Sequence, residues 1–265
     1  MLNVNMNKLN KNEKGFSPLA IIFAIVVFGL IATLGWAVYY KNHQPSSVNS
    51  RNATCPPGRV PEYSSTPGDN NYICIQPGHV IYDKPVIYLY PIHPEQVDVK
   101  LSLPVGFSKT VPNYDSSTGW QVLAQPDGTL TSLTDGRAYP YLFWESKPAP
   151  AMFNMTKGFV VAGSQTRAFL QSQLTAMGLN QNETNAFITF WLPKMQGNRY
   201  NLIHFAGSEY TNYAKLTVTP TPDSLLRVFM VFEPLRTPVQ VSPQSFPPFH
   251  RVGFTVVEWG GTSLN

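Results

Sequence analysis

The feature that most constrains this chain is an uncharged apolar segment near its N-terminus. Residues 16–40 contain no Asp, Glu, Lys or Arg. A helix rises about 1.5 Å per residue, so a segment of this length can cross the ~30 Å hydrocarbon core of a bilayer. Trp36, Tyr39 and Tyr40 lie at its C-terminal end, as is typical of a membrane interface. We therefore expect one transmembrane helix over residues 16–40.

The charges around this segment predict its orientation. Residues 1–15 carry three lysines and one glutamate, whereas only Lys41 and Arg51 follow the segment closely. The positive-inside rule then places the N-terminus in the cytoplasm and residues 41–265 outside it. Cleavage of a signal peptide after Ala37 is the alternative, but the apolar run is longer than a usual signal sequence, which favours a retained anchor. Both interpretations export the same domain.

The junction before the span carries a recognisable motif. Lys14, Gly15 and Phe16 resemble the leader of type IV prepilins and pseudopilins, which a peptidase cuts between the glycine and the phenylalanine. The resemblance implies a processing junction at Gly15 and Phe16. The chain departs from the family pattern at Ala20, where pilins usually carry a Glu that pairs with a neighbouring N-terminus during assembly. That departure favours a plain anchor, and a pilin-like minor subunit is an alternative.

A stalk and a closed loop are expected after the span. Residues 41–54 are rich in Ser and Asn and have no periodicity, which predicts a flexible stalk. Cys55 and Cys74 then bracket a loop rich in Pro and Gly. Their spacing is not that of a CxxC metal or redox motif, and an exported chain favours oxidised cysteines, so we expect a disulfide. Closing such a loop contributes about 3 kcal/mol of stability.

The remainder of the chain, residues 75–265, is predicted to be one α+β domain rich in strands. Residues 85–91 form a short apolar run between two prolines, which is typical of a buried strand. Residues 96–103 alternate apolar and polar side chains, as a half-buried strand does. Tight-turn sequences separate several of the other expected strands and favour a sandwich or meander. Those strands cover residues 119–124, 129–133, 138–145, 200–206, 215–219, 226–232 and 254–259.

A helical hairpin is expected to interrupt these strands. Ser164 is a candidate N-cap for a first helix that ends at Gly178. Asn180, with Glu183 three residues later, fits the capping box of a second helix. Pro193 is expected to end that second helix because proline lacks the N–H that a helix interior needs.

Three residues are weak candidates for catalysis. Glu145 and Glu258 each end an apolar strand beside a tryptophan, and a pair of carboxylates in such surroundings is what a sugar-cleaving site uses. The more common arrangement is that each pairs with an arginine such as Arg137, Arg227 or Arg251, or ends its strand in water. His204 is the one histidine inside a predicted strand, where it is more often a packed residue than a base.

Other chemical signatures are missing from the sequence. It contains no GxSxG, HExxH, Walker or GxGxxG motif, and its histidines do not have metal-ligand spacing. We therefore expect no cofactor and no metal. No run of Lys and Arg is longer than two residues, which argues against a nucleic-acid partner.

Aromatic residues cluster in the first half of the domain, and an exposed subset could stack against glycans or anchor a protein partner. They are Tyr82, Tyr88, Tyr90, Tyr139, Tyr141, Phe143 and Trp144.

Several segments of the domain resemble an exported bacterial domain of uncharacterised function. The resemblance implies that residues 75–261 are one unit, and it brings no activity with it. The segments are KPVIYLYP at 84–91, YLFWE at 141–145, WLPKM at 191–195 and FTVVEWGG at 254–261.

These observations lead to one expectation about function. We expect a single-pass protein of the bacterial cell envelope whose extracytoplasmic domain binds or scaffolds an envelope protein or glycan. The leading expectation is a non-catalytic role. The alternatives are an envelope glycan or peptidoglycan hydrolase that uses Glu145 and Glu258, and a pilin-like minor subunit.

Overall fold

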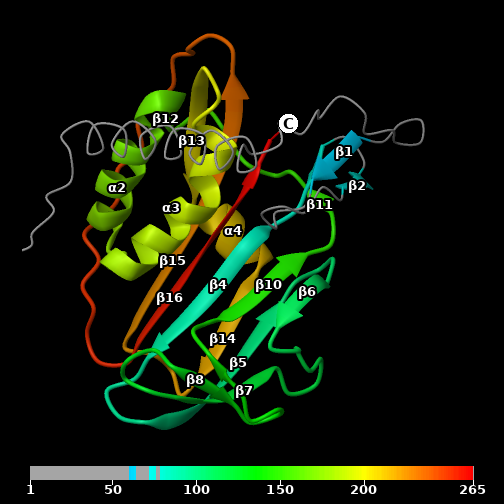
Figure 1. Ribbon diagram of the computed structural model, residues 1–265, viewed down its shortest axis with the longest axis vertical. Helices are drawn as coiled ribbons and strands as arrows, with labels where there is room; N and C mark the ends of the chain where they lie inside the picture. The colour runs from blue at the N-terminus through cyan, green and yellow to red at the C-terminus, as the bar shows by residue number, and fades with distance from the viewer. Residues whose placement is uncertain (1–59, 64–71, 76–77, 265) are drawn as a thin grey trace, which may run out of the picture. The chain divides into compact units, whose positions relative to one another are not determined.

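The structure is a computed structural model that describes the backbone of residues 60–63 and 72–75 and all of residues 78–264 (Figure 1). The expected span at 16–40, the junction at Gly15 and Phe16, the stalk at 41–54 and Cys55 lie outside the described residues. The transmembrane helix and the disulfide therefore stay predictions. None of the helices in the described ranges has the length and apolar character needed to cross a membrane.

The domain consists mostly of strands with a few helices, and its centre is a seven-stranded sheet. Strands β15 and β16 run parallel, and the other neighbours in this sheet are antiparallel. In spatial order the strands are β12 (Phe159–Ala162), β13 (Tyr200–Ala206), β15 (Ser224–Leu235), β16 (Thr255–Ser263), β4 (Asp83–Tyr90), β10 (Leu142–Ser146) and β6 (Phe107–Val111).

A second, antiparallel sheet packs on one face of the first. Its strands, in spatial order, are β14 (Lys215–Thr219), β5 (Glu95–Ser102), β7 (Trp120–Ala124), β8 (Leu130–Ser132) and β9 (Ala138–Tyr139). Two further pairs are β1 (Val60–Tyr63) with β2 (Tyr72–Ile75), and β3 (His79–Val80) with β11 (Ala149–Pro150).

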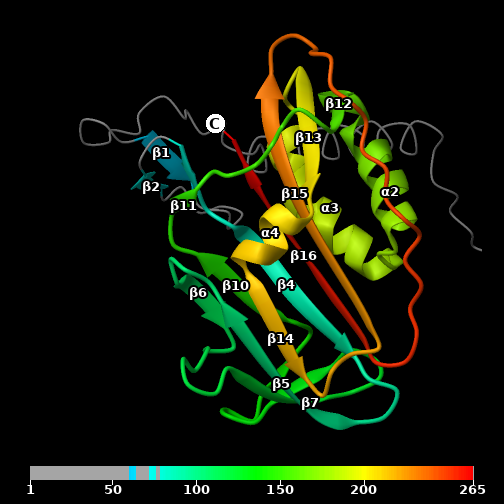
Figure 2. The same ribbon diagram turned by 180° about the vertical axis from the view of Figure 1, so that it is seen from behind.

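Helices and the second sheet cover opposite faces of the seven-stranded sheet. The helices α2 (Thr166–Met177) and α3 (Gln181–Met195) lie on one face (Figure 1), and α4 (Ser208–Tyr213) lies with β14 and β5 on the other (Figure 2). Each interface has its own buried apolar cluster, because a two-faced central sheet must bury both of its faces. Strand β15 contributes to both clusters, with Phe229 and Val231 on one side and Val228 and Met230 on the other.

The expected helical hairpin is present, and its second cap is confirmed. The Asn180 side chain accepts a hydrogen bond from the Glu183 backbone N–H at 2.9 Å, and the Glu183 carboxylate accepts one from the Asn180 N–H at 2.8 Å. Gly178 ends α2 in the left-handed region with φ 104°. Glycine reaches that conformation without the steric penalty of a Cβ.

Two details of the hairpin differ from the prediction. Ser164 lies in a 3-10 turn, labelled η2 (Gly163–Gln165), and α2 begins at Thr166 without a side-chain cap. Pro193 lies inside α3, which continues to Met195. The carbonyl that loses its partner there belongs to Thr189, and both Thr189 and Pro193 are exposed, so water can satisfy that carbonyl.

The strand expected over residues 138–145 is two strands, β9 and β10, in different sheets. The break falls at Pro140, which has no N–H to continue a ladder. The other expected strands correspond to β4, β5, β7, β8, β13, β14, β15 and β16.

Candidate ligand-binding face

Glu258 lies in a sealed ion pair between the two sheets. Its Oε2 accepts a hydrogen bond from Arg227 Nε at 2.5 Å, and its Oε1 accepts one from Trp144 Nε1 at 3.2 Å. The carboxylate is fully buried. Arg227 also donates to the carbonyl of Ala214 at 2.7 Å, and its guanidinium lies 4.7 Å from the ring centroid of Tyr210. Every charge here is matched by an internal partner, which is the arrangement of a structural pair.

This pair also shifts the ionisation of its neighbours. Burial by itself lowers the pKa of Arg227, but the adjacent carboxylate of Glu258 outweighs burial and raises that pKa above its usual value. Burial raises the pKa of Tyr210 well above its usual range, and the negative charge of Glu258 raises it further. The guanidinium therefore stays charged and the phenol neutral.

Glu145 lies on the opposite face of the seven-stranded sheet from Glu258. Successive side chains of a strand point to opposite faces, and Trp144, the neighbour of Glu145, reaches Glu258. Glu145 instead pairs with Lys109 of β6, whose Nζ lies 3.0 Å from Glu145 Oε2. The two carboxylates therefore do not form the pair on which a sugar-cleaving site depends.

His204 lies in a third place and is held by hydrogen bonds. Its Nδ1 donates to the carbonyl of Lys157 at 2.9 Å, and its Nε2 lies 3.0 Å from Glu209 Oε2. The other oxygen of Glu209 accepts from the backbone N–H of Asn154 at 2.9 Å. The buried imidazole thus ties β13 to α4 and to the loop before β12, which is a structural role.

The aromatic cluster found in the sequence divides into buried and accessible members. Tyr82 and Trp144 are fully buried in the core between the sheets, whereas Tyr141 and Phe143 are only half-buried. Tyr141, just before β10, and Phe143 within it pack against the apolar cluster on the helix side of the sheet. In Figure 1, α2 and α3 lie in front of one part of the sheet, and no described helix lies in front of β10 and β6. The surface formed by Tyr141 and Phe143 is therefore beside α3 and is not covered by it.

Lys84 of β4 joins these rings to α3. Its Nζ lies 5.1 Å from the ring centroid of Tyr141, 4.9 Å from that of Phe143 and 5.9 Å from that of Phe190 on α3. It also donates a hydrogen bond to the Tyr141 hydroxyl at 3.2 Å. We call Lys84, Tyr141, Phe143 and Phe190 the aromatic–lysine face.

The backbone at Lys84 is strained in a way that builds this face. Its φ is 55°, and no other non-glycine residue in the described part of the chain has a positive φ. For a side chain with a Cβ this left-handed conformation costs about 1–2 kcal/mol. Asp83 and Lys84 are consecutive, yet both reach the helix side, where Asp83 Oδ2 lies 2.6 Å from Lys194 Nζ of α3. A regular strand would have sent them to opposite faces.

The partner strand accommodates the same irregularity. The register between β16 and β4 shifts between Trp259 and Gly261. A Cβ at Gly260 would lie 2.9 Å from the Cα of Pro85, so the close approach of the two backbones there requires a glycine. The pairing of β4 with β16 is therefore irregular where the Lys84 ammonium reaches the rings. Irregularities of this kind concentrate at functional sites.

The charges of the aromatic–lysine face leave one cation without an acidic partner. Asp83 is paired with Lys194 and Glu145 with Lys109. Within residues 78–264 no carboxylate lies within ion-pair distance of Lys84. An ammonium among half-buried rings can receive an anionic group while the rings receive an apolar surface of the same ligand.

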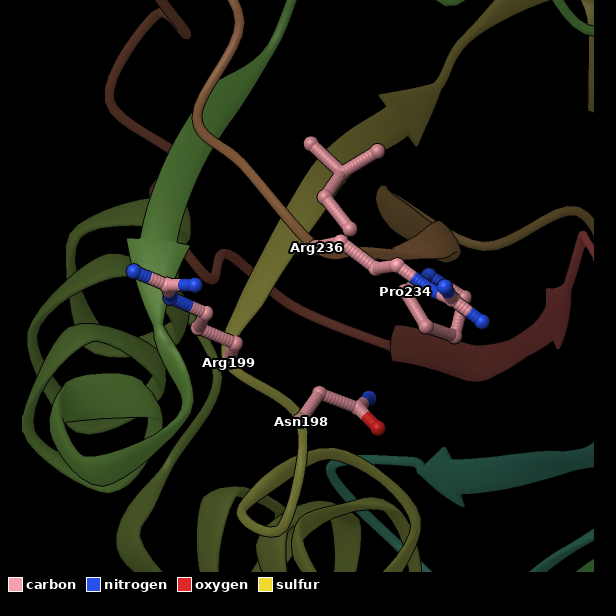
Figure 3. Close-up of a pocket in the computed structure, with 5 residues that line it drawn as sticks. Asn198, Arg199, Pro234 and Arg236 are labelled. Atoms are coloured by element: carbon pink, nitrogen blue, oxygen red, sulfur yellow. The ribbon is translucent and has the colours of Figure 1, made fainter.

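A separate hollow of about 380 Å³ opens where β13 begins and β15 ends (Figure 3). It is lined by Asn198, Arg199, Pro234, Leu235 and Arg236. In Figure 3 the Arg199 side chain points toward β12 and away from Arg236. The two guanidinium groups therefore do not converge on one point. In the ranges that the structure describes, no three His, Cys, Asp or Glu side chains are grouped so that they could hold a metal ion.

Comparison of the chain with models of known protein families and with solved structures finds no match. Over 63 residues, 23% of this chain, it is 38% identical to an uncharacterised protein from the bglA 3′ region of Butyrivibrio fibrisolvens. The chain spans 64% of the length of that relative.

Proposed function

We propose that this chain is a membrane-anchored, extracytoplasmic binding protein of the bacterial cell envelope, and that the aromatic–lysine face holds an anionic envelope glycan. The observation that carries the proposal is the Lys84 ammonium, placed by a left-handed backbone among three rings and without an acidic partner in the described residues.

Three members of the face have separate parts in binding. Lys84 Nζ donates to a carboxylate or phosphate of the glycan, and the Tyr141 hydroxyl, already bonded to Lys84, orients that ammonium. The rings of Phe143 and Tyr141 offer an apolar surface for the face of a sugar ring. The flanking pairs Asp83–Lys194 and Glu145–Lys109 hold the strands and α3 in register around the ligand.

The sequence supports the membrane part of the proposal. The apolar residues 16–40 cross the bilayer once, with the N-terminus in the cytoplasm and the stalk at 41–54 leading to the domain. Cys55 and Cys74 form a disulfide in the oxidising exterior. Resistance of the chain to extraction with alkaline carbonate tests the anchor, and labelling of thiols with and without a reductant tests the disulfide.

Sedimentation with purified peptidoglycan sacculi tests the binding site. The full chain in mild detergent is compared with Lys84→Met, which keeps the length of the side chain and removes its charge. A charge-assisted hydrogen bond contributes about 1.5–3 kcal/mol, so we expect binding to weaken by about tenfold to a hundredfold. Phe143→Ala should also weaken binding, because it removes the apolar surface.

The matched control is Lys215→Met, which removes an exposed lysine from β14 in the other sheet. It should bind sacculi as the unmodified chain does. Unchanged binding by Lys84→Met, or an equal loss with Lys215→Met, would contradict the proposal. Near-ultraviolet circular dichroism of each variant checks that the fold is retained.

A further inference from the structure

Three arginines lie beyond the same end of three neighbouring strands of the seven-stranded sheet. Arg167 follows β12 in the first turn of α2, Arg199 precedes β13, and Arg236 follows β15. The register aligns Ala162 with Tyr200, and Tyr200 with Leu235, so Arg199 and Arg236 lie just beyond one line of paired residues, and Arg167 follows Ala162 by five residues. Strands in a sheet are about 4.8 Å apart, so the backbones at Arg199 and Arg236 lie close together. We call Arg167, Arg199 and Arg236 the basic end.

The basic end is exposed and carries an excess of positive charge. All three side chains are exposed, and within residues 78–264 none of them forms an ion pair. The acidic residue on these strands is Glu233, which is half-buried and two residues before Leu235. The first turn of α2 contains no acidic residue, and the N-terminal end of a helix dipole adds positive potential. Arg199 and Arg236 also line the hollow in Figure 3.

The opposite end of the sheet has the opposite charge. Glu95 begins β5 after β4 ends, Asp127 lies in the turn between β7 and β8, and Asp223 precedes β15. Arg251 at that end is paired with the buried Glu183. The domain is therefore polarised along its strands, with free cations at one end and acidic turns at the other.

β4 starts toward the basic end. β4 starts at Asp83, which pairs with Gly261 close to the end of β16, while β16 and β15 run together toward Leu235. Residues 78–82, which directly precede β4, therefore lie toward the end of the sheet that carries the arginines.

We infer that the basic end contacts the anionic phospholipid headgroups of the membrane that holds the chain. The inference rests on the proposed membrane anchor. Arginine matches the geometry of phosphate oxygens with paired N–H groups, and basic residues at an anionic membrane surface add their attractions. Because Arg199 and Arg236 point apart, the group suits several headgroups on a surface better than one enclosed anion. The contact would orient the domain with its acidic turns away from the bilayer.

The test uses the full chain reconstituted into lipid nanodiscs. One set contains only phosphatidylcholine, and the other also contains phosphatidylglycerol. Hydrogen exchange is followed at residues 163–167, 197–200 and 235–237. We expect slower exchange in these segments only in the phosphatidylglycerol discs, and loss of that protection at high salt, because salt screens surface charge.

Charge variants identify the residues responsible. The triple variant Arg167→Gln, Arg199→Gln and Arg236→Gln should lose the protection, with affinity for the surface falling about fivefold for each arginine removed. The matched control removes three exposed cations elsewhere, by Lys100→Gln, Arg137→Gln and Lys215→Gln. It should keep the protection.

The outcomes separate this inference from the proposed function. Equal exchange in both kinds of disc, or equal loss in the control variant, would overturn the inference while leaving the anchor and the aromatic–lysine face in place. Protection by inorganic phosphate in discs without phosphatidylglycerol would overturn the lipid assignment in favour of a soluble anion. Release of the chain from the discs would overturn the anchor and this inference together.

Discussion

Replacing Glu258 with Gln should destabilise the domain strongly although it changes few atoms. If the amide oxygen still accepts from Trp144, the amide NH2 faces the Nε–H of Arg227, so the substitution removes both the charge and the acceptor that Arg227 uses. Arg227 exposes only 7% of its side chain and cannot turn to water. Removing one partner of a buried pair costs about 3–5 kcal/mol, which is a large share of the roughly 5–15 kcal/mol that stabilises a typical domain.

Urea unfolding of the full chain in mild detergent, followed by tryptophan fluorescence, measures this cost. Lys109→Gln is the comparison, because it breaks an ion pair whose lysine is 53% exposed. Water reaches the lysine of this pair, so breaking it should cost less than breaking the fully buried one. The double variant Arg227→Met and Glu258→Leu should recover much of the loss, since apolar residues can replace a buried pair. A cost below about 1 kcal/mol for Glu258→Gln would refute the assignment of Glu258 as a structural residue.

Three further predictions concern stability. Burial raises the pKa of Tyr82, Tyr88 and Tyr210, so above about pH 10 the unfolded chain releases protons that the folded chain keeps. Stability should fall as pH rises through that range, by up to about 1.4 kcal/mol per pH unit for each tyrosine, and a urea midpoint that is unchanged from about pH 10 to about pH 11 would contradict this. Asn180→Ala should cost about 1 kcal/mol in urea unfolding because α3 loses its cap, and a stability equal to the unmodified chain would be inconsistent with the capping box. Gly178→Ala should lower the melting temperature, because φ is 104° there and a Cβ would lie 2.8 Å from Phe249; an unchanged melting temperature would argue against this turn.

Local patterns predicted the elements whose burial follows from their own sequence. The alternation of residues 96–103 identifies β5, and the capping box at Asn180 locates the start of α3. The edge strands β6 and β12 were missed. β6 reads FSKTV and has no apolar alternation, and all four side chains of β12 are half-buried. α4 was missed because it is short and buries only Tyr210.

The candidate site depends on neighbours that a sequence does not specify. Both Glu145 and Glu258 were correctly expected on apolar strands, but their faces follow from the spatial order of β16, β4 and β10. Lys84 precedes Pro85, and the residue before a proline is expected to be extended. Its left-handed φ is therefore the opposite of what the local rule predicts, and it is explained by the bulge in β16 and the contacts with α3. The sequence placed Tyr141 and Phe143 in an aromatic cluster, but it indicated neither Phe190 as their neighbour nor the lysine that joins the three rings.

The most direct test of the aromatic–lysine face is a photo-crosslink from the face itself in intact cells. Phe143→benzoylphenylalanine places the reactive group at the centre of the proposed binding surface, and Leu123→benzoylphenylalanine places it on an exposed position of the other sheet. The account predicts that irradiation attaches muramidase-sensitive glycan to the first variant and not to the second, and that Lys84→Met abolishes the attachment. Equal glycan attachment from both positions, or none from position 143, would contradict it.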